Sequence, residues 1–316
     1  MVEPATLPGT VQVKAPVGAE QRACKMLLPE LEQAGHWSDV RIAVTHAPAR
    51  VLAAAAFAPG LDPDGIRHSS ILLRVAKPFR RQGIGSRLLE HLEAEARQRN
   101  AASLRITFDP FAEPDTVHFL KAQGFECVDR FLTFESDTQQ LMDYLFPLKD
   151  WLQARGDIPT SARVVPLIET DLEKVARLHV DHLGGTFAGV LTHLKHLITG
   201  PSHFHNAVLL AHNEPEGLIL CQNHNGLTQV QSRVVSPAYQ GSAFNPGWAN
   251  VLLMAEVLGY AHLVGSHRCR FSCLGSNGHT LKLATRCKAE TVATQEVHRR
   301  TLTQLVSSLT VGTAIS

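Results

Sequence analysis

One stretch, residues 71–99, constrains the fold of this chain most, because three local patterns follow one another in it. Ile71–Val75 is an apolar run with β-branched ends, which predicts a buried strand. Arg80–Gly85 is basic and contains two glycines. From Ile84 onward, apolar residues recur at near-helical spacing, namely Leu88, Leu89, Leu92 and Ala96. The predicted order is therefore strand, glycine turn, helix.

The glycine turn, residues 80–85, has the properties of an anion site. The first N–H groups of a helix have no partner within the helix and lie at the positive end of its dipole. Gly83 and Gly85 carry no Cβ, so a phosphate can approach the backbone and the turn can adopt a positive φ. Arg80 and Arg81 add positive charge. Taken alone, the two glycines are also explained by a tight turn with solvated arginines.

The segment Arg80-Arg-Gln-Gly-Ile-Gly85 resembles the acyl-CoA motif Arg/Gln-x-x-Gly-x-Gly/Ala of the GNAT N-acetyltransferase superfamily. It is not the dinucleotide fingerprint, which has a third glycine and an acidic residue on a following strand. The resemblance extends over residues 70–134, with a strand at Leu104–Phe108, a helix, and a closing Gly124-Phe125 step. It implies an α/β fold in which a mixed, mostly antiparallel central sheet is flanked by helices, and acetyl-CoA as the co-substrate.

The resemblance also implies which groups hold acyl-CoA. The backbone of Leu73 and Val75, with Leu72 as a further candidate, would hold the pantetheine arm. The turn and the start of the helix would hold the phosphates, through Arg80, Arg81, Gln82, Gly83, Gly85 and Ser86.

Composition limits the class of protein. A chain of 316 residues accommodates two domains, and a net charge of +1 provides no global field for nucleic acid, membrane or acidic partners. The six cysteines form no Cys-x-x-Cys pair, so reduced thiols are expected. The first residues do not resemble a signal peptide, and no apolar run reaches the ~18–20 residues of a membrane span. A cytoplasmic location is expected.

The second half of the chain looks like another copy of the first. Arg163–His179 resembles the family's opening strand and first helix, and Gln229–Val235 is another strand. The next segment aligns with the glycine turn at one constant offset: Gln240 falls on Arg80, Ala243 on Gly83 and Asn245 on Gly85. A helix is expected from Pro246. Asn245 adds a side chain where the backbone would meet phosphate, so little acyl-CoA binding is expected there.

The expected division is an N-terminal, acyl-CoA-binding GNAT domain at 1–136, a connecting helix and linker at 137–161, and a degenerate C-terminal GNAT-like domain at 162–316. Each domain is expected to have its own sheet with a central splayed strand pair. In the first, a hairpin is expected around Asp129-Arg130, and Pro147 is expected to kink or split the connecting helix.

The catalytic groups are less clearly defined. In this family a tyrosine that protonates the leaving thiolate usually stands directly after the position of Phe119, where this chain has Leu120. The weak candidates to act instead are His118, Asp109, His68 and Ser70, and each also has a simpler structural or solvent-facing interpretation.

The seventeen histidines raise the question of a metal site. His179/His182 and His193/His196 have helical spacing, and His203/His205 has strand spacing. Zinc needs three or four convergent ligands with supporting contacts, and no His-Glu-x-x-His motif is present. Surface or interface histidines and no metal are therefore expected.

The resemblance implies an N-acetyltransferase that moves an acetyl group from acetyl-CoA to a primary amine, and direct attack in a ternary complex is expected. The layout also resembles mycothiol-synthase-type acetyltransferases, but in those the intact motif is placed differently, so their substrate is not carried over. The alternative is a non-catalytic acyl-CoA-binding or regulatory module, suggested by Leu120 and the altered second copy. The expected partner is a small-molecule or peptide amine, for a monomer or homodimer. Nucleic acid is not expected, because there is no basic-aromatic stripe.

Overall fold

The computed structural model describes residues 11–29, 39–46, 49–61, 65–111, 113–199, 204–242 and 245–302. The first half contains β1 (Val11–Lys14), α1 (Ala19–Leu27), β2 (Asp39–His46), β3 (Ala49–Leu61), β4 (Arg67–Val75), a 3-10 turn (Lys77–Phe79), α3 (Ile84–Gln98), β5 (Ser103–Phe108), α4 (Pro114–Ala122) and β6 (Glu126–Asp137). After α5 (Thr138–Ala154), the second half contains β7 (Arg163–Pro166), α6 (Leu172–Leu183), α7 (Phe187–Thr199), β8 (Phe204–Ala211), β9 (Glu214–His224), β10 (Leu227–Val235), a 3-10 turn (Pro237–Tyr239), β11 (Gly241–Ser242), β12 (Asn245–Pro246), α8 (Trp248–Leu263), β13 (Arg268–Leu274), α9 (Gly278–Arg286) and β14 (Glu290–Thr301). The α/β fold and the repeated order of elements are as predicted.

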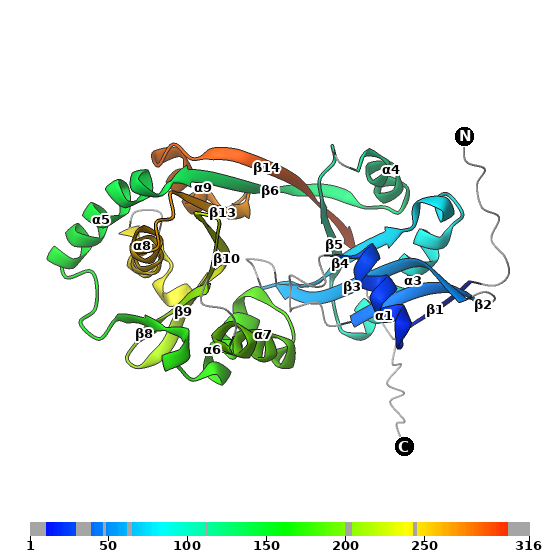
Figure 1. Ribbon diagram of the computed structural model, residues 1–316, viewed down its shortest axis with the longest axis horizontal. Coiled ribbons are helices and arrows are strands. Elements are labelled where there is room, and N and C mark those ends of the chain that lie inside the picture. The colour runs from blue at the N-terminus through cyan, green and yellow to red at the C-terminus, as the bar shows by residue number, and fades with distance from the viewer. Residues whose placement is uncertain are drawn as a thin grey trace, which may run out of the picture.

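Twelve strands form one sheet in the order β1-β2-β3-β4-β5-β14-β6-β13-β10-β9-β8-β7. The last strand of each half has been exchanged: β14 lies between β5 and β6, and β6 pairs with β13. Figure 1 shows β6 and β14 side by side, connecting the two halves of the molecule. The prediction of one separate sheet per half is therefore wrong, because the exchange joins both into one.

The hairpin predicted around Asp129-Arg130 is also wrong. Both residues remain extended inside β6, opposite Val297 and Glu296 of β14. An Asp-Arg pair lacks the glycine or asparagine that a tight hairpin needs for positive φ. The neighbouring strand comes instead from the other half of the chain.

In each half the two central parallel strands pair at only one end. β4 pairs with β5 through His68–Ser70, and β10 pairs with β13 through Leu227–Gln229. Beyond these residues the strands separate, and we call the two openings the N-terminal V and the C-terminal V. On the open side of each V, backbone groups of β4 and β10 have no neighbouring strand with which to pair.

Helices cover both faces of the first half. Leu88, Leu89 and Leu92 of α3 pack on one face, and Cys24 and Leu28, of α1 and the residue after it, pack on the other. Strand β3 contributes alanines to both faces, which lets the helices approach closely. The structure contains no helix long and apolar enough to cross a membrane among its described residues.

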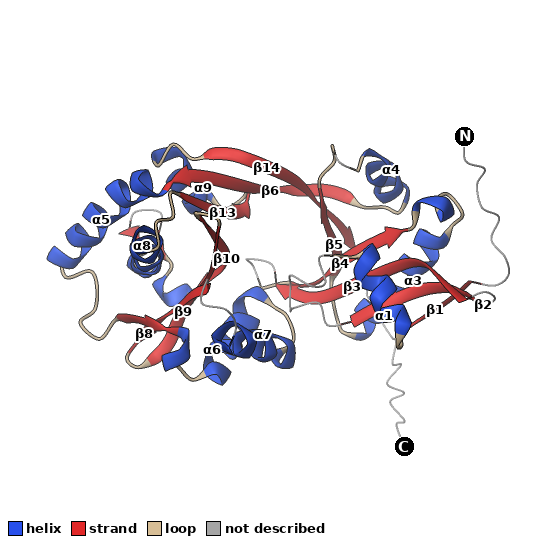
Figure 2. Ribbon diagram, viewed as in Figure 1, coloured by secondary structure: helices blue, strands red, loops and turns tan. Residues whose placement is uncertain are grey.

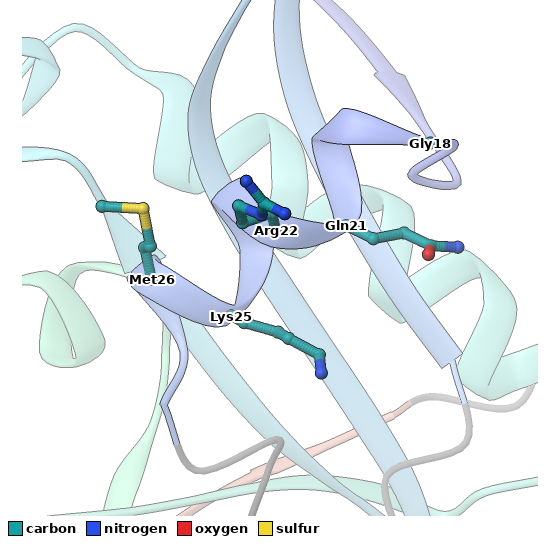
Figure 3. A pocket seen from close by; sticks show the side chains of 5 residues that line it. All are labelled: Gly18, Gln21, Arg22, Lys25 and Met26. Atoms are coloured by element: carbon teal, nitrogen blue, oxygen red, sulfur yellow. The ribbon is translucent and has the colours of Figure 1, made fainter.

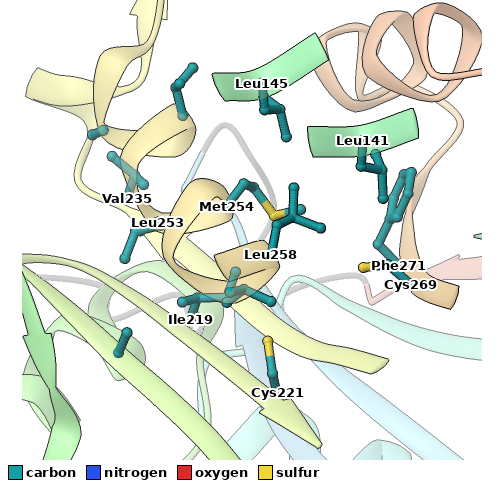
Figure 4. Close-up of a cluster of buried hydrophobic side chains, with 14 of the residues drawn as sticks. Leu141, Leu145, Ile219, Cys221, Val235, Leu253, Met254, Leu258, Cys269 and Phe271 are labelled. Carbon is teal, nitrogen blue, oxygen red and sulfur yellow. The ribbon is translucent and has the colours of Figure 1, made fainter. Parts of the chain in front are cut away.

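The second half has the same layered arrangement. Figure 2 shows α6 and α7 on one side of β8–β10 and α8 on the other. The connecting helix α5 runs through Pro147 without being split, and Leu141 and Leu145 of α5 pack into the core with Met254 and Leu258 of α8 (Figure 4). The predicted connecting helix is therefore part of the core of the second half.

Candidate functional site

The glycine turn joins the open end of β4 to α3. Gly83 has φ 76° and directly precedes the first helical residue, Ile84, with no side chain capping the helix. A Cβ on Gly83 would meet no atom within 4 Å, so glycine is favoured there by the left-handed backbone and not by lack of space. The unpaired N–H groups of the first turn of α3 are thereby left without a covering side chain.

Gly85 has a different role. It is buried, and a Cβ there would lie 3.4 Å from the Phe119 ring and 3.5 Å from Cγ2 of Val75. The absence of a side chain therefore lets α3, α4 and β4 pack closely. The sequence suggested close approach of a phosphate at this position, and the structure adds close packing of three elements.

The polar side chains of the turn are held by local contacts. Arg81 forms an ion pair with Asp115 (Nη2–Oδ1, 2.8 Å) on the surface, and Gln82 Nε2 donates to the Pro78 carbonyl at 3.4 Å. Ser86 Oγ accepts a hydrogen bond from Gln123 Nε2 at 3.2 Å, which ties α3 to the end of α4. The residues predicted to bind phosphate thus surround one helix N-terminus.

Arg80 makes a contact that the sequence did not predict. Its Nε donates to the Val75 carbonyl at 3.1 Å, which links the turn back to the end of β4. In the second half, Gln240 Nε2 donates to the Val235 carbonyl at 2.7 Å, in the equivalent place. Arginine and glutamine are the two residues that the motif allows at this position, and both can donate this bond.

Leu73 and Val75 lie in the part of β4 that borders the N-terminal V. Their partners on β3 are Ala55 and Ala53, whereas the pairing with β5 has already ended at Ser70. Both side chains pack against the core under α3. On the V side of this segment no strand pairs with β4 beyond Ser70.

The candidate catalytic residues lie on separate elements. His68 is buried at the paired end of β4, so close to Gly60 that a Cβ there would come within 2.4 Å of its Nε2. Asp109 follows β5, and its Oδ1 accepts a hydrogen bond from the Phe111 N–H at 2.8 Å. His118 is exposed on α4, and the neighbouring Leu120 is fully buried in the core.

The sequence did not single out an ion pair that crosses the N-terminal V. Arg74 of β4 contacts Glu113, which immediately precedes α4, and Oε2 of Glu113 accepts from the Thr116 hydroxyl at 3.2 Å. Side chains alternate along a strand, so Arg74 points to the face opposite Leu73 and Val75. This places a partly exposed carboxylate on the side of the V away from α3.

The exchange of the last strands brings two titratable side chains of β14, His298 and Glu296, into the first half. His298 of β14 is buried with its Nε2 2.9 Å from Oε2 of Glu296, and its ring centre is 5.1 Å from that of Phe108. Ligand atoms of Cys127, Glu296 and His298 lie within 4.8 Å of one another, whereas His179/His182 and His193/His196 belong to no such group among the described residues, and His203 lies outside them. Sequence spacing gave no signal for this group, because β6 and β14 are far apart in the chain.

The corresponding turn of the second half is built differently. β11 and β12 form a short hairpin, and α8 begins at Trp248, so the prediction of a helix from Pro246 is wrong. A Cβ on Gly247 would lie 2.1 Å from the Gln240 carbonyl oxygen, so the hairpin closes directly onto the helix start. Ala243 lies outside the described residues. The N-terminus of α8 therefore lies directly after Gly247.

A shallow cavity of about 520 Å³ lies elsewhere, along α1 (Figure 3). It is lined by Gly18, Gln21, Arg22, Lys25 and Met26. Because α1 and α3 cover opposite faces of the sheet, this cavity is separate from the glycine turn.

Comparisons with known proteins agree with this geometry. Residues 29–125 match the model of the acetyltransferase (GNAT) family. The structure resembles a GCN5-related N-acetyltransferase from Sphaerobacter thermophilus, with 17% identity over 94% of this chain and 97% of that chain and a TM-score of 0.51. It also resembles one from Anabaena variabilis ATCC 29413 (12% identity, 93% and 73% coverage, TM-score 0.61).

A further similar structure is a tandem GNAT protein from the clavulanic acid biosynthesis pathway, with 15% identity over 93% of this chain and 99% of that chain and a TM-score of 0.54. No curated protein matches the sequence. Residues 29–125 therefore match a GNAT acetyltransferase module, and along its length the chain has the fold of these GNAT proteins, one of which is a tandem GNAT protein.

Proposed function

We propose that the N-terminal V binds acetyl-CoA and that the protein transfers the acetyl group to a primary amine by direct attack in a ternary complex. The observation that carries the proposal is the continuity of the open edge of β4 with the uncapped N-terminus of α3 through the left-handed Gly83. A long ligand with amides at one end and phosphates at the other matches this arrangement.

Each part of acetyl-CoA has a suitable group in this proposal. The pantetheine amides would pair with the free backbone edge of β4 near Leu73 and Val75, as an added strand does. The phosphates would lie at the first turn of α3, where N–H groups and the helix dipole favour negative charge. Arg80 would hold the turn in place through the Val75 carbonyl, and Arg81 would add positive charge nearby.

The reaction forms a C–N bond and breaks the thioester C–S bond. The amine must be neutral to attack, the new ammonium must lose a proton, and the thiolate of CoA must gain one. Glu113 is the first base to test, because its carboxylate lies on the side of the V away from α3, where an acceptor can approach. Leu120 occupies the place of the family's usual acid, and a buried leucine cannot supply a proton.

The direct test is turnover. Purified protein is incubated with acetyl-CoA and a panel of aminosugars, amino acids, other small amines and peptides with free N-termini, and CoA release and acetylated products are measured. We expect at least one amine to be acetylated, and Glu113→Gln to lower kcat more than it changes KM for acetyl-CoA. Saturable acetyl-CoA binding without any acetylated product would instead support the non-catalytic acyl-CoA-binding alternative.

A further inference from the structure

The C-terminal V contains an arginine that no feature of the proposed reaction uses. Arg233 of β10 alternates with Val234, which packs under α6 and α7, and therefore faces the side covered by α8. Its Nη2 donates to the hydroxyl of Thr280 in the first turn of α9 at 3.1 Å. Because α9 follows β13, this contact reaches from one arm of the V to the other.

The charge of Arg233 is not balanced by a protein carboxylate. Among the described residues, none places a carboxylate oxygen within 4.0 Å of its guanidinium. Cys221 and Cys273 could balance the charge only as thiolates. Burial raises the pKa of both thiols, so they are neutral near pH 7. Arg233 itself is half-buried, and burial lowers its pKa.

Two other arginines of this half, unlike Arg233, are paired with a carboxylate. Arg268 and Arg270 of β13 both contact the buried carboxylate of Glu135. At the position equivalent to Arg233, the first half has Leu73, which packs against apolar side chains. The unbalanced cation is therefore specific to the C-terminal V.

We propose that the C-terminal V binds the carboxylate group of a small organic acid, with Arg233 as its counter-ion. The planar fork of a guanidinium matches a carboxylate through two parallel hydrogen bonds. The Thr280 hydroxyl provides a further polar contact, and Cys221, Cys273 and Phe271 belong to the buried core of this half. Figure 4 shows Cys221 and Phe271 in this core.

Acyl-CoA does not fit this second site in the same way. The turn before α8 is a hairpin, and α8 begins only at Trp248, so its N-terminus lies further along the chain than the N-terminus of α3 that would hold the phosphates. The long side chain of Arg233 also crosses the opening in which a pantetheine arm would lie in the first half. A short acid needs neither a helix N-terminus for phosphates nor an open channel for a pantetheine arm.

The test uses the full chain and propionate as the probe, with sodium chloride at equal ionic strength as the reference. We expect propionate to raise the Tm of the wild type in a saturable way, by about 2–4 °C at ten times its Kd. Arg233→Met should lose this response. Arg286→Met, which removes an exposed arginine from the other end of α9, changes the net charge equally and should retain it.

Two results would overturn the proposal: a propionate response no larger than that of chloride in the wild type, or a full response in Arg233→Met. A larger response to inorganic phosphate than to propionate would show that the ligand class is wrong. If Arg233→Met does not fold, Arg233→Lys retains the charge but loses the fork, and calorimetric titration should give a Kd for propionate at least tenfold weaker. An unchanged Kd in that variant would equally overturn the assignment.

Discussion

Substitution of Gly83 separates the backbone requirement of the glycine turn from its role in binding phosphate. Any other residue at φ 76° should cost roughly 1–2 kcal/mol of folding free energy, and this cost is shared by Gly83→Gln and Gly83→Glu. No atom lies within 4 Å of the new Cβ, so the Cβ itself creates no clash in either variant. Both variants should therefore melt a few degrees below the wild type, and by the same amount.

The two variants should differ in their affinity for acetyl-CoA. A carboxylate about 4 Å from a phosphate costs about 1–4 kcal/mol, depending on exposure, which raises the Kd by a factor of about 5 to several hundred. We expect Gly83→Glu to bind acetyl-CoA at least tenfold more weakly than Gly83→Gln, and the difference to shrink as salt is added. The Kd is measured by calorimetric titration and the Tm by thermal unfolding with and without acetyl-CoA.

The control lies in the other half. Gly241 also has a positive φ, of 86°, so Gly241→Glu introduces comparable backbone strain and the same charge in the turn before α8. Its affinity for acetyl-CoA should match that of the wild type. Equal affinities of Gly83→Glu and Gly83→Gln would refute the placement of the phosphates at α3. Weak binding by Gly241→Glu alone would assign acetyl-CoA to the second half.

Three further predictions concern stability and reactivity. Gly60→Ala should destabilise the protein by about 1–3 kcal/mol in urea unfolding, because its Cβ would overlap the buried ring of His68; an unchanged midpoint would contradict the packing described. Glu135→Gln should cost about 1.5–3 kcal/mol in the same measurement, since it weakens the charge-assisted hydrogen bonds from two partly exposed arginines of β13; a loss below about 0.5 kcal/mol would contradict the ion pairs. Cys127 is the one exposed cysteine of the six, so one thiol should react quickly with an aromatic disulfide reagent at pH 8 and the other five only after unfolding; two fast thiols would contradict the burial pattern.

The local part of the site could be predicted from sequence. A strand, a glycine turn and an amphipathic helix are each encoded within a few residues, so the position of Gly83 before α3 followed from the pattern alone. The constant offset between the two halves also pairs residues with the same role, because Arg80 and Gln240 each donate a hydrogen bond to the carbonyl at the end of the preceding strand. These features depend on neighbours that are close in the chain.

The features that were missed depend on distant partners. β6 and β14 have ordinary strand patterns, and nothing in either one specifies that its neighbours belong to the other half. The contribution of His298 to the first half follows only from this exchange. Similarly, the start of α8 at Trp248 reflects how the preceding hairpin closes against Gly247, which no helical periodicity records.

The exchange of β6 and β14 has a consequence for synthesis of the chain on the ribosome. When β6 has been made, the position beside β5 is still empty, and it is filled only when translation reaches residue 301. At about 5–20 residues per second this interval lasts roughly 10–30 s. Throughout it, β5 exposes an unpaired edge of the kind that associates with other chains. The sheet of the first half is therefore completed only after the second half has been synthesised.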